Sequence, residues 1–297
     1  MDVLNIATSE FILNGPHNNL KFDCCFDPFF KEKSAANAAF NIFCKGSSAE
    51  IRSLSIVEDE PWSFNALGEQ FEIVRRNRTG RAIWRIRTSS SFCSADIDWD
   101  EMLFMDYYQS YEKAWKSGLG MTVVMLGLLN KNGLLFHGAA VELDEQGAMF
   151  VGACGRGKST ISKLLHEAGA LVLTDERPAI HGNAINDVGR PSRFDVYGTP
   201  WPSSAGFYAN AKAGLKKIYF LEHGTENTIK PLSLYDALSK LLDVALVPWQ
   251  IPELFDPCLK TVETLLANVP AAVLSFKPDE EVVDVIRKDL AADREIL

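Results

Sequence analysis

A phosphate-binding motif at residues 152–159 is the feature that most constrains this chain. The segment reads Gly152-Ala-Cys-Gly-Arg-Gly157-Lys158-Ser159 and fits the pattern G-x-x-x-x-G-K-[ST]. In such a loop the glycines let backbone N–H groups approach a phosphate, the lysine reaches the β- and γ-phosphates, and the hydroxyl binds Mg²⁺. The motif therefore predicts a site for a nucleoside triphosphate, and the alternative is an ordinary glycine-rich turn.

The residues around the motif favour the phosphate-binding interpretation. The apolar run Ala148–Val151 predicts a short buried strand before the loop. After the loop, apolar residues at helical spacing predict a helix from Thr160 to Ala168, with Gly169 at its C-terminal cap. Such a helix points its positive end at the bound anion. The residues expected to hold ATP, or another nucleoside triphosphate, are Gly152, Ala153, Cys154, Gly155, Arg156, Gly157, Lys158, Ser159 and Thr160.

Composition excludes several classes of partner. With a net charge of −9 and no basic cluster that stands out against it, the chain is not expected to bind nucleic acid. No apolar run reaches the roughly 18 residues of a membrane helix, so no membrane contact is expected. The N-terminus lacks the features of a signal peptide. Cysteines at 24, 25, 44, 93, 154 and 258 show no C-x-x-C spacing, which indicates reduced thiols and a cytoplasmic location.

The pattern of apolar residues changes along the chain. The first hundred residues carry short apolar runs between turn residues, which predicts a β-rich module, and a helical pattern then continues to Leu129. We expect residues 1–112 to form this module, which could select an acceptor. Residues 113–297 would then form the nucleotide-binding and catalytic domain. Within the module, Arg81–Arg87 alternates like a strand with an arginine-rich face, which predicts a solvated sheet edge.

The strand before the loop is expected to have an antiparallel neighbour. Leu134–Leu143 and Ala148–Val151 both have strand character, and the four residues between them resemble a hairpin connection. In most proteins with this loop, the strand belongs to a parallel sheet built of βαβ units. The sequence therefore predicts an α/β domain with a mixed sheet.

Three further residues are candidates for chemistry. Asp175 and Glu176 end the apolar run Leu171–Thr174, one helix and one turn after Lys158, so we expect this strand beside the strand of the loop. A carboxylate there can hold Mg²⁺ or accept the proton of an attacking hydroxyl, although acidic residues also end strands in solvent. His137 lies within a predicted strand, where a histidine is more often a hydrogen-bonded core residue than an acid–base group.

Together these segments resemble HPr kinase/phosphorylase and its stand-alone relatives, which are grouped with the ATP-dependent phosphoenolpyruvate carboxykinases. The matching segments are Phe136–Val141, Gly152–Thr160 and Leu171–Glu176, and the resemblance spans roughly residues 120–297. It implies a P-loop kinase fold with Lys158 on the phosphates, Asp175 as general base and His137 as its partner. It also implies that Ser159 and Glu176 hold Mg²⁺, and by analogy that the chain forms a homo-oligomer.

The chain departs from the family in two places. The second acid is Glu176 instead of aspartate, and the glycine-rich signature loop of the HPr-phosphorylating enzymes has no counterpart. In its place, residues 189–204 look like the Gly-Thr-Pro-Trp segment of related proteins in peptide-modification and other biosynthetic cassettes. Arg190 and Arg193 of this segment could grip a phosphate or a substrate carboxylate. The alternative is a plain surface loop with Trp201 packed below it.

These observations favour a kinase that transfers the γ-phosphate of ATP to a hydroxyl on a small molecule, peptide or protein. One alternative is a non-catalytic, nucleotide-dependent switch that assists a peptide-modification or biosynthetic partner. Another is an ATPase or GTPase, in which water is the acceptor. Asp175 and His137 favour the kinase, because nucleotide binding alone needs neither residue.

Overall fold

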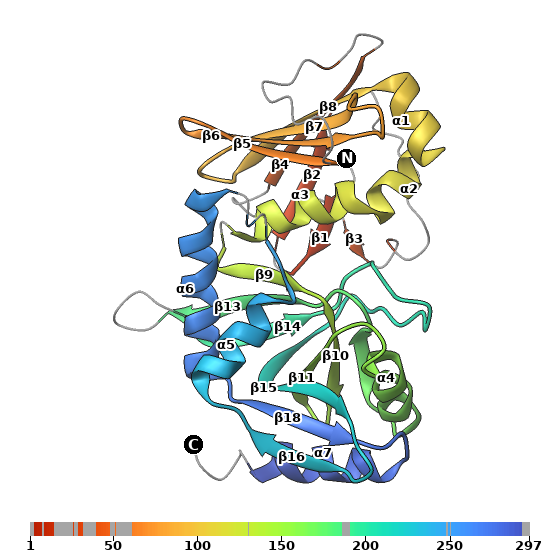
Figure 1. Ribbon diagram of the computed structural model, residues 1–297, viewed down its shortest axis with the longest axis vertical. Coiled ribbons are helices and arrows are strands. Elements are labelled where there is room, and N and C mark those ends of the chain that lie inside the picture. The colour runs from red at the N-terminus through yellow and green to blue at the C-terminus, as the bar shows by residue number, and fades with distance from the viewer. Residues whose placement is uncertain are drawn as a thin grey trace. The chain divides into compact units, whose positions relative to one another are not determined.

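The computed structural model shows a mixed α/β protein with two mixed sheets (Figure 1). It describes residues 3–7, 9–14, 26, 29–31, 40–47, 51, 61–129, 131–185, 191–247, 249 and 251–292. The chain divides into two compact units, residues 1–130 with 248–255 and residues 131–247 with 256–297. The sequence placed a boundary at residue 112, whereas the helices up to residue 129 group with the first unit.

The first unit contains an eight-stranded sheet, which accounts for the β-rich pattern of the first hundred residues. The strand order is β3-β1-β2-β4-β8-β7-β6-β5, and β4 runs parallel to both of its neighbours. The strands are β1 (Val3–Ile6), β2 (Ser9–Asn14), β3 (Phe30–Lys31), β4 (Phe40–Ser47), β5 (Trp62–Leu67), β6 (Gln70–Arg76), β7 (Ala82–Ser89) and β8 (Ser94–Asp100).

The arginine-rich strand is not at a sheet edge, so that prediction was wrong. Strand β7 lies between β6 and β8. Its arginines are tolerated inside the sheet because carboxylates on the neighbouring strands neutralise them. Arg85 lies 2.7 Å from Asp98 on β8 and 3.7 Å from Glu72 on β6, and Arg87 also contacts Asp98, at 3.2 Å.

Three helices complete the described part of the first unit: α1 (Glu101–Tyr108), α2 (Tyr111–Lys116) and α3 (Gly118–Leu129). The side chains of Asp100 and Ser110 cap the first two by accepting from backbone N–H groups. The third is buried over most of its length, as the apolar sequence predicts. Among the described residues, no helix combines the length and apolar character needed to span a membrane.

The second unit contains a ten-stranded sheet around the phosphate-binding motif. Its main path is β12-β10-β11-β15-β14-β13-β9-β17, and β18 and β16 extend it from β15. The strands are β9 (Gly133–Phe136), β10 (Gly138–Leu143), β11 (Gln146–Val151), β12 (Leu171–Thr174), β13 (Ala179–Ile185), β14 (Pro191–Tyr197), β15 (Lys212–His223), β16 (Thr228–Pro231), β17 (Ala245–Leu246) and β18 (Ala271–Phe276).

The predicted strand Leu134–Leu143 is broken at His137. Strands β9 and β10 lie on either side of this residue and near opposite ends of the sheet path. The predicted antiparallel pairing with the strand of the loop is confirmed, because β10 pairs with β11. The strand that ends at Asp175 was expected beside the loop strand, but β10 lies between β12 and β11. The position beside β11 is taken by β10, its hairpin partner.

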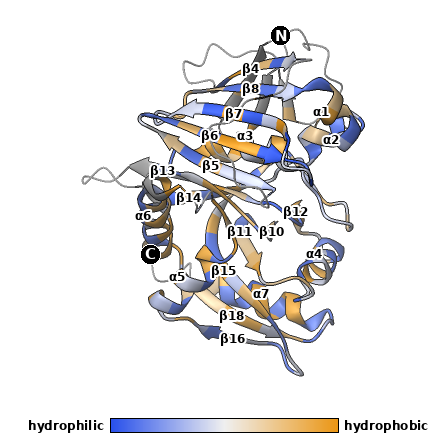
Figure 2. Cartoon of the chain, turned by 45° about the horizontal axis from the view of Figure 1, so that its top comes forward, coloured by the Kyte–Doolittle hydropathy of each residue, from blue (hydrophilic) through white to orange (hydrophobic). Residues whose placement is uncertain are grey.

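The remaining helices are α4 (Lys158–Glu167), α5 (Leu234–Leu242), α6 (Pro252–Asn268) and α7 (Glu281–Ala292). Helices α4 and α7 show hydrophilic and hydrophobic residues side by side (Figure 2). Their apolar sides pack on the sheet in one buried cluster that includes Phe150, Ile161, Tyr219, Leu274 and Ile286. This cluster holds the loop strand and the loop helix in a fixed relation, because buried side chains are close-packed.

Candidate functional site

The phosphate-binding motif has the local structure that it requires. Strand β11 ends at Val151, residues 152–157 form a tight loop, and α4 begins at Lys158. Gly157 has a φ of 93°, and a Cβ at this position would lie 2.7 Å from Cζ of Phe276. Both the backbone conformation and the space therefore require glycine. The strand and the helix that the sequence predicted on either side of the loop are present.

Lys158 lies across this loop. Its ammonium group donates to the carbonyl oxygens of Gly152 at 2.8 Å and Ala153 at 3.2 Å, and the residue is only 7% exposed. Burial lowers the pKa of Lys158, and the carboxylate of Glu176 acts in the opposite direction. Ser159, the predicted Mg²⁺ ligand, is half-buried in the first turn of the same helix.

His137 sits between β9 and β10, at a corner where backbone hydrogen bonds join it and its neighbours to two distant segments. The backbone N–H of His137 donates to the carbonyl oxygen of Val244 at 2.7 Å. The backbone N–H groups of Phe136 and Gly138 donate to the carbonyl oxygens of Pro178 and Glu176, respectively. Gly138 is needed because a Cβ there would lie 2.9 Å from the carbonyl oxygen of Phe150. The His-Gly pair thus fixes the histidine beside the segment that follows β12.

His137, Glu176 and Arg177 form a cluster at this corner. Oε1 of Glu176 lies 3.4 Å from Nδ1 of His137 and 3.0 Å from Nη1 of Arg177. Nη1 of Arg177 also contacts Nδ1 of His137. Because a guanidinium can only donate, a hydrogen bond here requires an unprotonated Nδ1. Sequence reasoning missed Arg177, and its place directly after the two acids was the one available signal.

The cluster keeps the histidine neutral. Burial, followed by the charges of Arg177 and Lys158, lowers the pKa of His137 from an ordinary 6.5 to about 4. Near pH 7 the contact between His137 and Glu176 is therefore not an ion pair. The charges of Glu176 and Arg177 both act on the pKa of Lys158, the first raising it and the second lowering it. The cluster and the loop lysine therefore belong to one site.

This lowered pKa predicts a loss of stability in acid. Between about pH 6.5 and pH 4 the unfolded chain binds a proton at His137 that the native chain does not. The free energy of unfolding should therefore fall as the pH falls through this window. We expect His137→Asn to flatten this fall relative to the parent, measured by urea unfolding at several pH values. An equal pH slope in both proteins would contradict the assignment.

Asp175, the predicted general base, is fully buried at 0% exposure. Its Oδ1 accepts from the backbone N–H of Ser203 at 2.7 Å, and its Oδ2 accepts from the hydroxyl of Ser203 at 2.6 Å. The segment that carries Ser203 also contacts Arg177, since the Thr199 hydroxyl donates to the Arg177 carbonyl at 2.6 Å. Asp175 and Glu176 thus face different surroundings, although they are adjacent in sequence.

The two predicted substrate arginines are not part of this cluster as the structure describes it. Arg190 lies outside the described residues, as do Cys24 and Cys25. Arg193 is exposed on β14 and pairs with Asn183, four residues before Tyr197. At about 3.4 Å per residue, Arg193 lies more than 10 Å along β14 from Tyr197, which pairs with Ala179 at the end of the β13–β14 pair next to Arg177. Trp201 is buried, but residues 191–197 form β14 within the sheet, so the segment is not a plain surface loop.

His223 is a second residue that sequence reasoning missed. It ends β15, and its Nε2 lies 2.9 Å from the carbonyl oxygen of Gly155 in the loop. The register explains this contact, because Val151 pairs with Phe220 and β15 continues three residues further. No local sequence pattern marks this contact, which depends on the pairing of β11 with β15.

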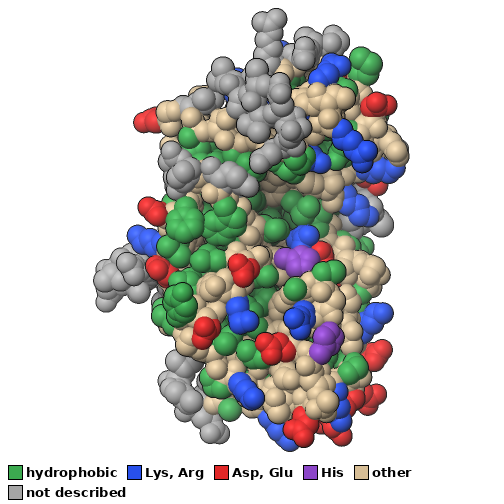
Figure 3. Space-filling view, in the orientation of Figure 1, with side chains coloured by type: hydrophobic (Ala, Val, Ile, Leu, Met, Phe, Trp, Pro, Cys, Tyr) green, Lys and Arg blue, Asp and Glu red, His purple; other side chains and the backbone are tan. Residues whose placement is uncertain are grey.

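The described residues contain no group of three His, Cys, Asp or Glu side chains that could hold a metal ion. The face shown in Figure 3 has acidic, basic and histidine side chains interspersed, without a continuous basic surface among the residues drawn in colour.

The exposed Cys154 provides a probe of the loop. Cys154 and Cys93 are exposed, whereas burial raises the pKa of Cys44 and of Cys258 to about 12 and makes these two unreactive. We expect ATP at about ten times its Kd to slow alkylation of Cys154 about tenfold, because one site in ten remains free. Peptide mass spectrometry would follow each thiol. Equal slowing at Cys93 would contradict protection by the loop.

Comparisons with known proteins include a weak structural similarity. No protein-family model matches the chain, and no curated protein matches it. Among solved structures, the HPr(Ser) kinase/phosphatase from Coxiella burnetii is similar with a TM-score of 0.31 and 12% sequence identity. The match covers 54% of this chain and 98% of that chain. At this level of similarity, the function has to be inferred from the site itself.

Proposed function

We propose that this chain is an ATP-dependent kinase that transfers the γ-phosphate to a hydroxyl on a small molecule, peptide or protein. The observation that carries the proposal is the arrangement around the loop lysine. Lys158 lies across a glycine-rich loop at the start of a helix and interacts electrostatically with Glu176 and Arg177. Phosphoryl transfer depends mainly on positioning and on positive charge around the transferred group, and this site offers both.

Each residue has a role in this proposal. The loop amides and Lys158 bind the β- and γ-phosphates, and Arg177 adds positive charge beside the transferred group. Asp175 is the general base. Its Oδ2 already accepts from a serine hydroxyl at 2.6 Å, which is the distance a base needs from the hydroxyl that it deprotonates. The acceptor hydroxyl takes the place of the Ser203 hydroxyl, and Arg177, which contacts both His137 and Glu176, holds Glu176 in position.

The donor set is suited to Mg²⁺. The hydroxyl of Ser159 and the carboxylate of Glu176 are both partly exposed oxygen ligands, which Mg²⁺ prefers. When bound between the phosphates, the ion would supply positive charge that neutralises their oxygens. Ser159 lies in the first turn of α4, and Glu176 follows the end of β12.

A second candidate function is a nucleotide-dependent switch without catalysis. The observation that favours it is the burial of Asp175, whose two oxygens are both engaged by Ser203. In such a protein Asp175 anchors the segment around Ser203. Nucleotide binding near Arg177 would then move this segment through its contact with Thr199.

The two functions are separated by the fate of the γ-phosphate. The full chain would be incubated with γ-labelled ATP, Mg²⁺ and hydroxyl acceptors, including serine-containing peptides and small alcohols. A kinase places label on an acceptor, and a hydrolase releases it as inorganic phosphate. Binding of ATP without either product, in a preparation whose Cys154 is protected by ATP, would refute the kinase and leave the switch.

A further inference from the structure

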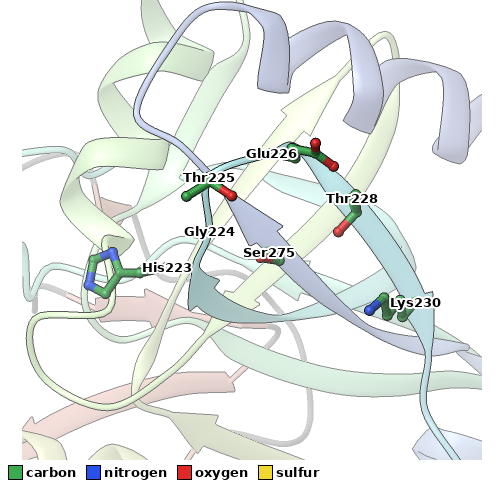
Figure 4. Close-up of a pocket in the computed structure, with 7 residues that line it drawn as sticks. All are labelled: His223, Gly224, Thr225, Glu226, Thr228, Lys230 and Ser275. Carbon is green, nitrogen blue, oxygen red and sulfur yellow. The ribbon is translucent and has the colours of Figure 1, made fainter.

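A surface hollow lies next to the tip of the phosphate-binding loop. It has a volume of about 600 Å³, within the usual range for small-molecule sites, and it is open to solvent. Figure 4 shows Ser275 near its middle, His223 at one end and Lys230 at the other. We call it the β15–β18 pocket, and its lining residues are His223, Gly224, Thr225, Glu226, Thr228, Lys230 and Ser275.

The pocket and the loop lie at the same edge of the sheet. Strands β11, β15 and β18 are neighbours and run parallel, so their carboxyl ends meet at one edge. The loop follows β11, and the pocket is formed by the turn after β15, by the end of β18 and by β16, which carries Thr228 and Lys230. In open α/β sheets, ligands bind outside the carboxyl ends of the strands.

One lining residue of the pocket contacts the loop, and a residue next to the pocket packs against it. His223, which lines the pocket, lies with its Nε2 2.9 Å from the carbonyl oxygen of Gly155. Phe276, at the end of β18, packs against Gly157 so closely that a Cβ there would lie 2.7 Å from its ring. A ligand held by the loop amides therefore has the pocket directly beside it.

The catalytic cluster fixes the direction in which the nucleotide lies. Glu176 and Arg177 interact with Lys158 and follow β12, which is on the other side of β11 from β15. Because the loop lysine binds the β- and γ-phosphates, the terminal phosphate belongs on the β12 side. The rest of the nucleotide then extends toward β15 and β18.

The chemistry of the pocket suits a sugar and a base. Its side chains offer hydroxyls, a carboxylate, an ammonium group and an imidazole. The side chains of five lining residues make no hydrogen bond or ion pair with any other residue that the structure describes: Thr225, Glu226, Thr228, Lys230 and Ser275. A carboxylate is the group that nucleotide-binding proteins commonly use to accept from ribose hydroxyls.

We propose that the β15–β18 pocket binds the nucleoside part of the nucleotide, with Glu226 accepting from the ribose hydroxyls. This inference rests on the proposed function, because the phosphates must be held by the loop. It goes beyond phosphate binding, since the loop alone would hold tripolyphosphate as well as ATP. The pocket adds the preference for a nucleoside.

The test compares ATP with tripolyphosphate by calorimetric titration of the full chain in the presence of Mg²⁺. We expect Glu226→Gln to weaken ATP binding about tenfold and to leave tripolyphosphate binding unchanged. Glu222→Gln is the matched control, because Glu222 is an exposed acid near the end of β15, four residues before Glu226, and does not line the pocket. Dideoxy-ATP, which lacks both ribose hydroxyls, should bind the parent and Glu226→Gln equally.

The outcomes separate this inference from the proposed function. If Glu226→Gln binds ATP as tightly as the parent, or if the parent binds tripolyphosphate as tightly as ATP, the nucleoside pocket is overturned and the loop stands. If the parent binds neither ligand, the proposed function fails and the inference fails with it. Because Glu226 is exposed, its substitution is not expected to affect folding, and thermal unfolding would verify this.

Discussion

Lys158→Ala should weaken binding of ATP by about 10- to 100-fold. The ammonium group of Lys158 is held over the loop by two carbonyl oxygens, and its hydrogen bonds to phosphates would be charge-assisted. Because the residue is largely buried, no other cation can take its place without moving the loop. Titration with a fluorescent ATP analogue would measure the change.

Lys163→Ala is the control for this substitution. Lys163 lies on the same helix α4 and is exposed, so its removal changes the net charge equally without touching the loop. We expect it to bind ATP within about twofold of the parent, since exposed charges contribute little. If both variants bound ATP equally well, the loop could not be the phosphate site.

Asp175→Asn should lower the rate of phosphoryl transfer by about 100- to 10,000-fold, the contribution typical of a general base. Binding of ATP should persist, because Asp175 contacts Ser203 and not the loop. Single-turnover transfer to the best acceptor would give the rate, and titration would give the affinity.

Ser203→Ala separates catalysis from anchoring. This substitution removes the hydroxyl on Oδ2 of Asp175 and keeps the backbone hydrogen bond to Oδ1. If Asp175 is the base, its freed oxygen is open to the acceptor, and transfer should be at least as fast as in the parent. If Asp175 only anchors the segment, Asp175→Asn would transfer phosphate at the parental rate and mainly lower the free energy of unfolding.

Local patterns predicted the loop and its immediate surroundings. The motif at residues 152–159, the strand before it, the helix after it and the antiparallel entry strand are all present in the structure. These features depend on residues close together in sequence, so hydrophobic period and glycine positions were sufficient. The β-rich start and the following helices were predicted for the same reason.

Long-range pairing determined what the sequence could not predict. The break at His137 arises because β9 pairs with β13 and β17, which lie far along the chain, whereas β10 pairs with β11 and β12. The position of β12 was wrong because the hairpin already filled the place beside β11. The burial of Asp175 depends on Ser203, 28 residues away, and Arg177 belongs to no recognisable motif.

The corner at His137 also determines when the site can form. Its backbone hydrogen bonds join the segment around residue 137 to the carbonyls of Glu176, Pro178 and Val244. These three partners come from segments that are synthesised one after another. Contacts between distant segments form slowly, because the entropy of loop closure must be overcome first. During synthesis the corner can therefore be completed only after Val244 has left the ribosome.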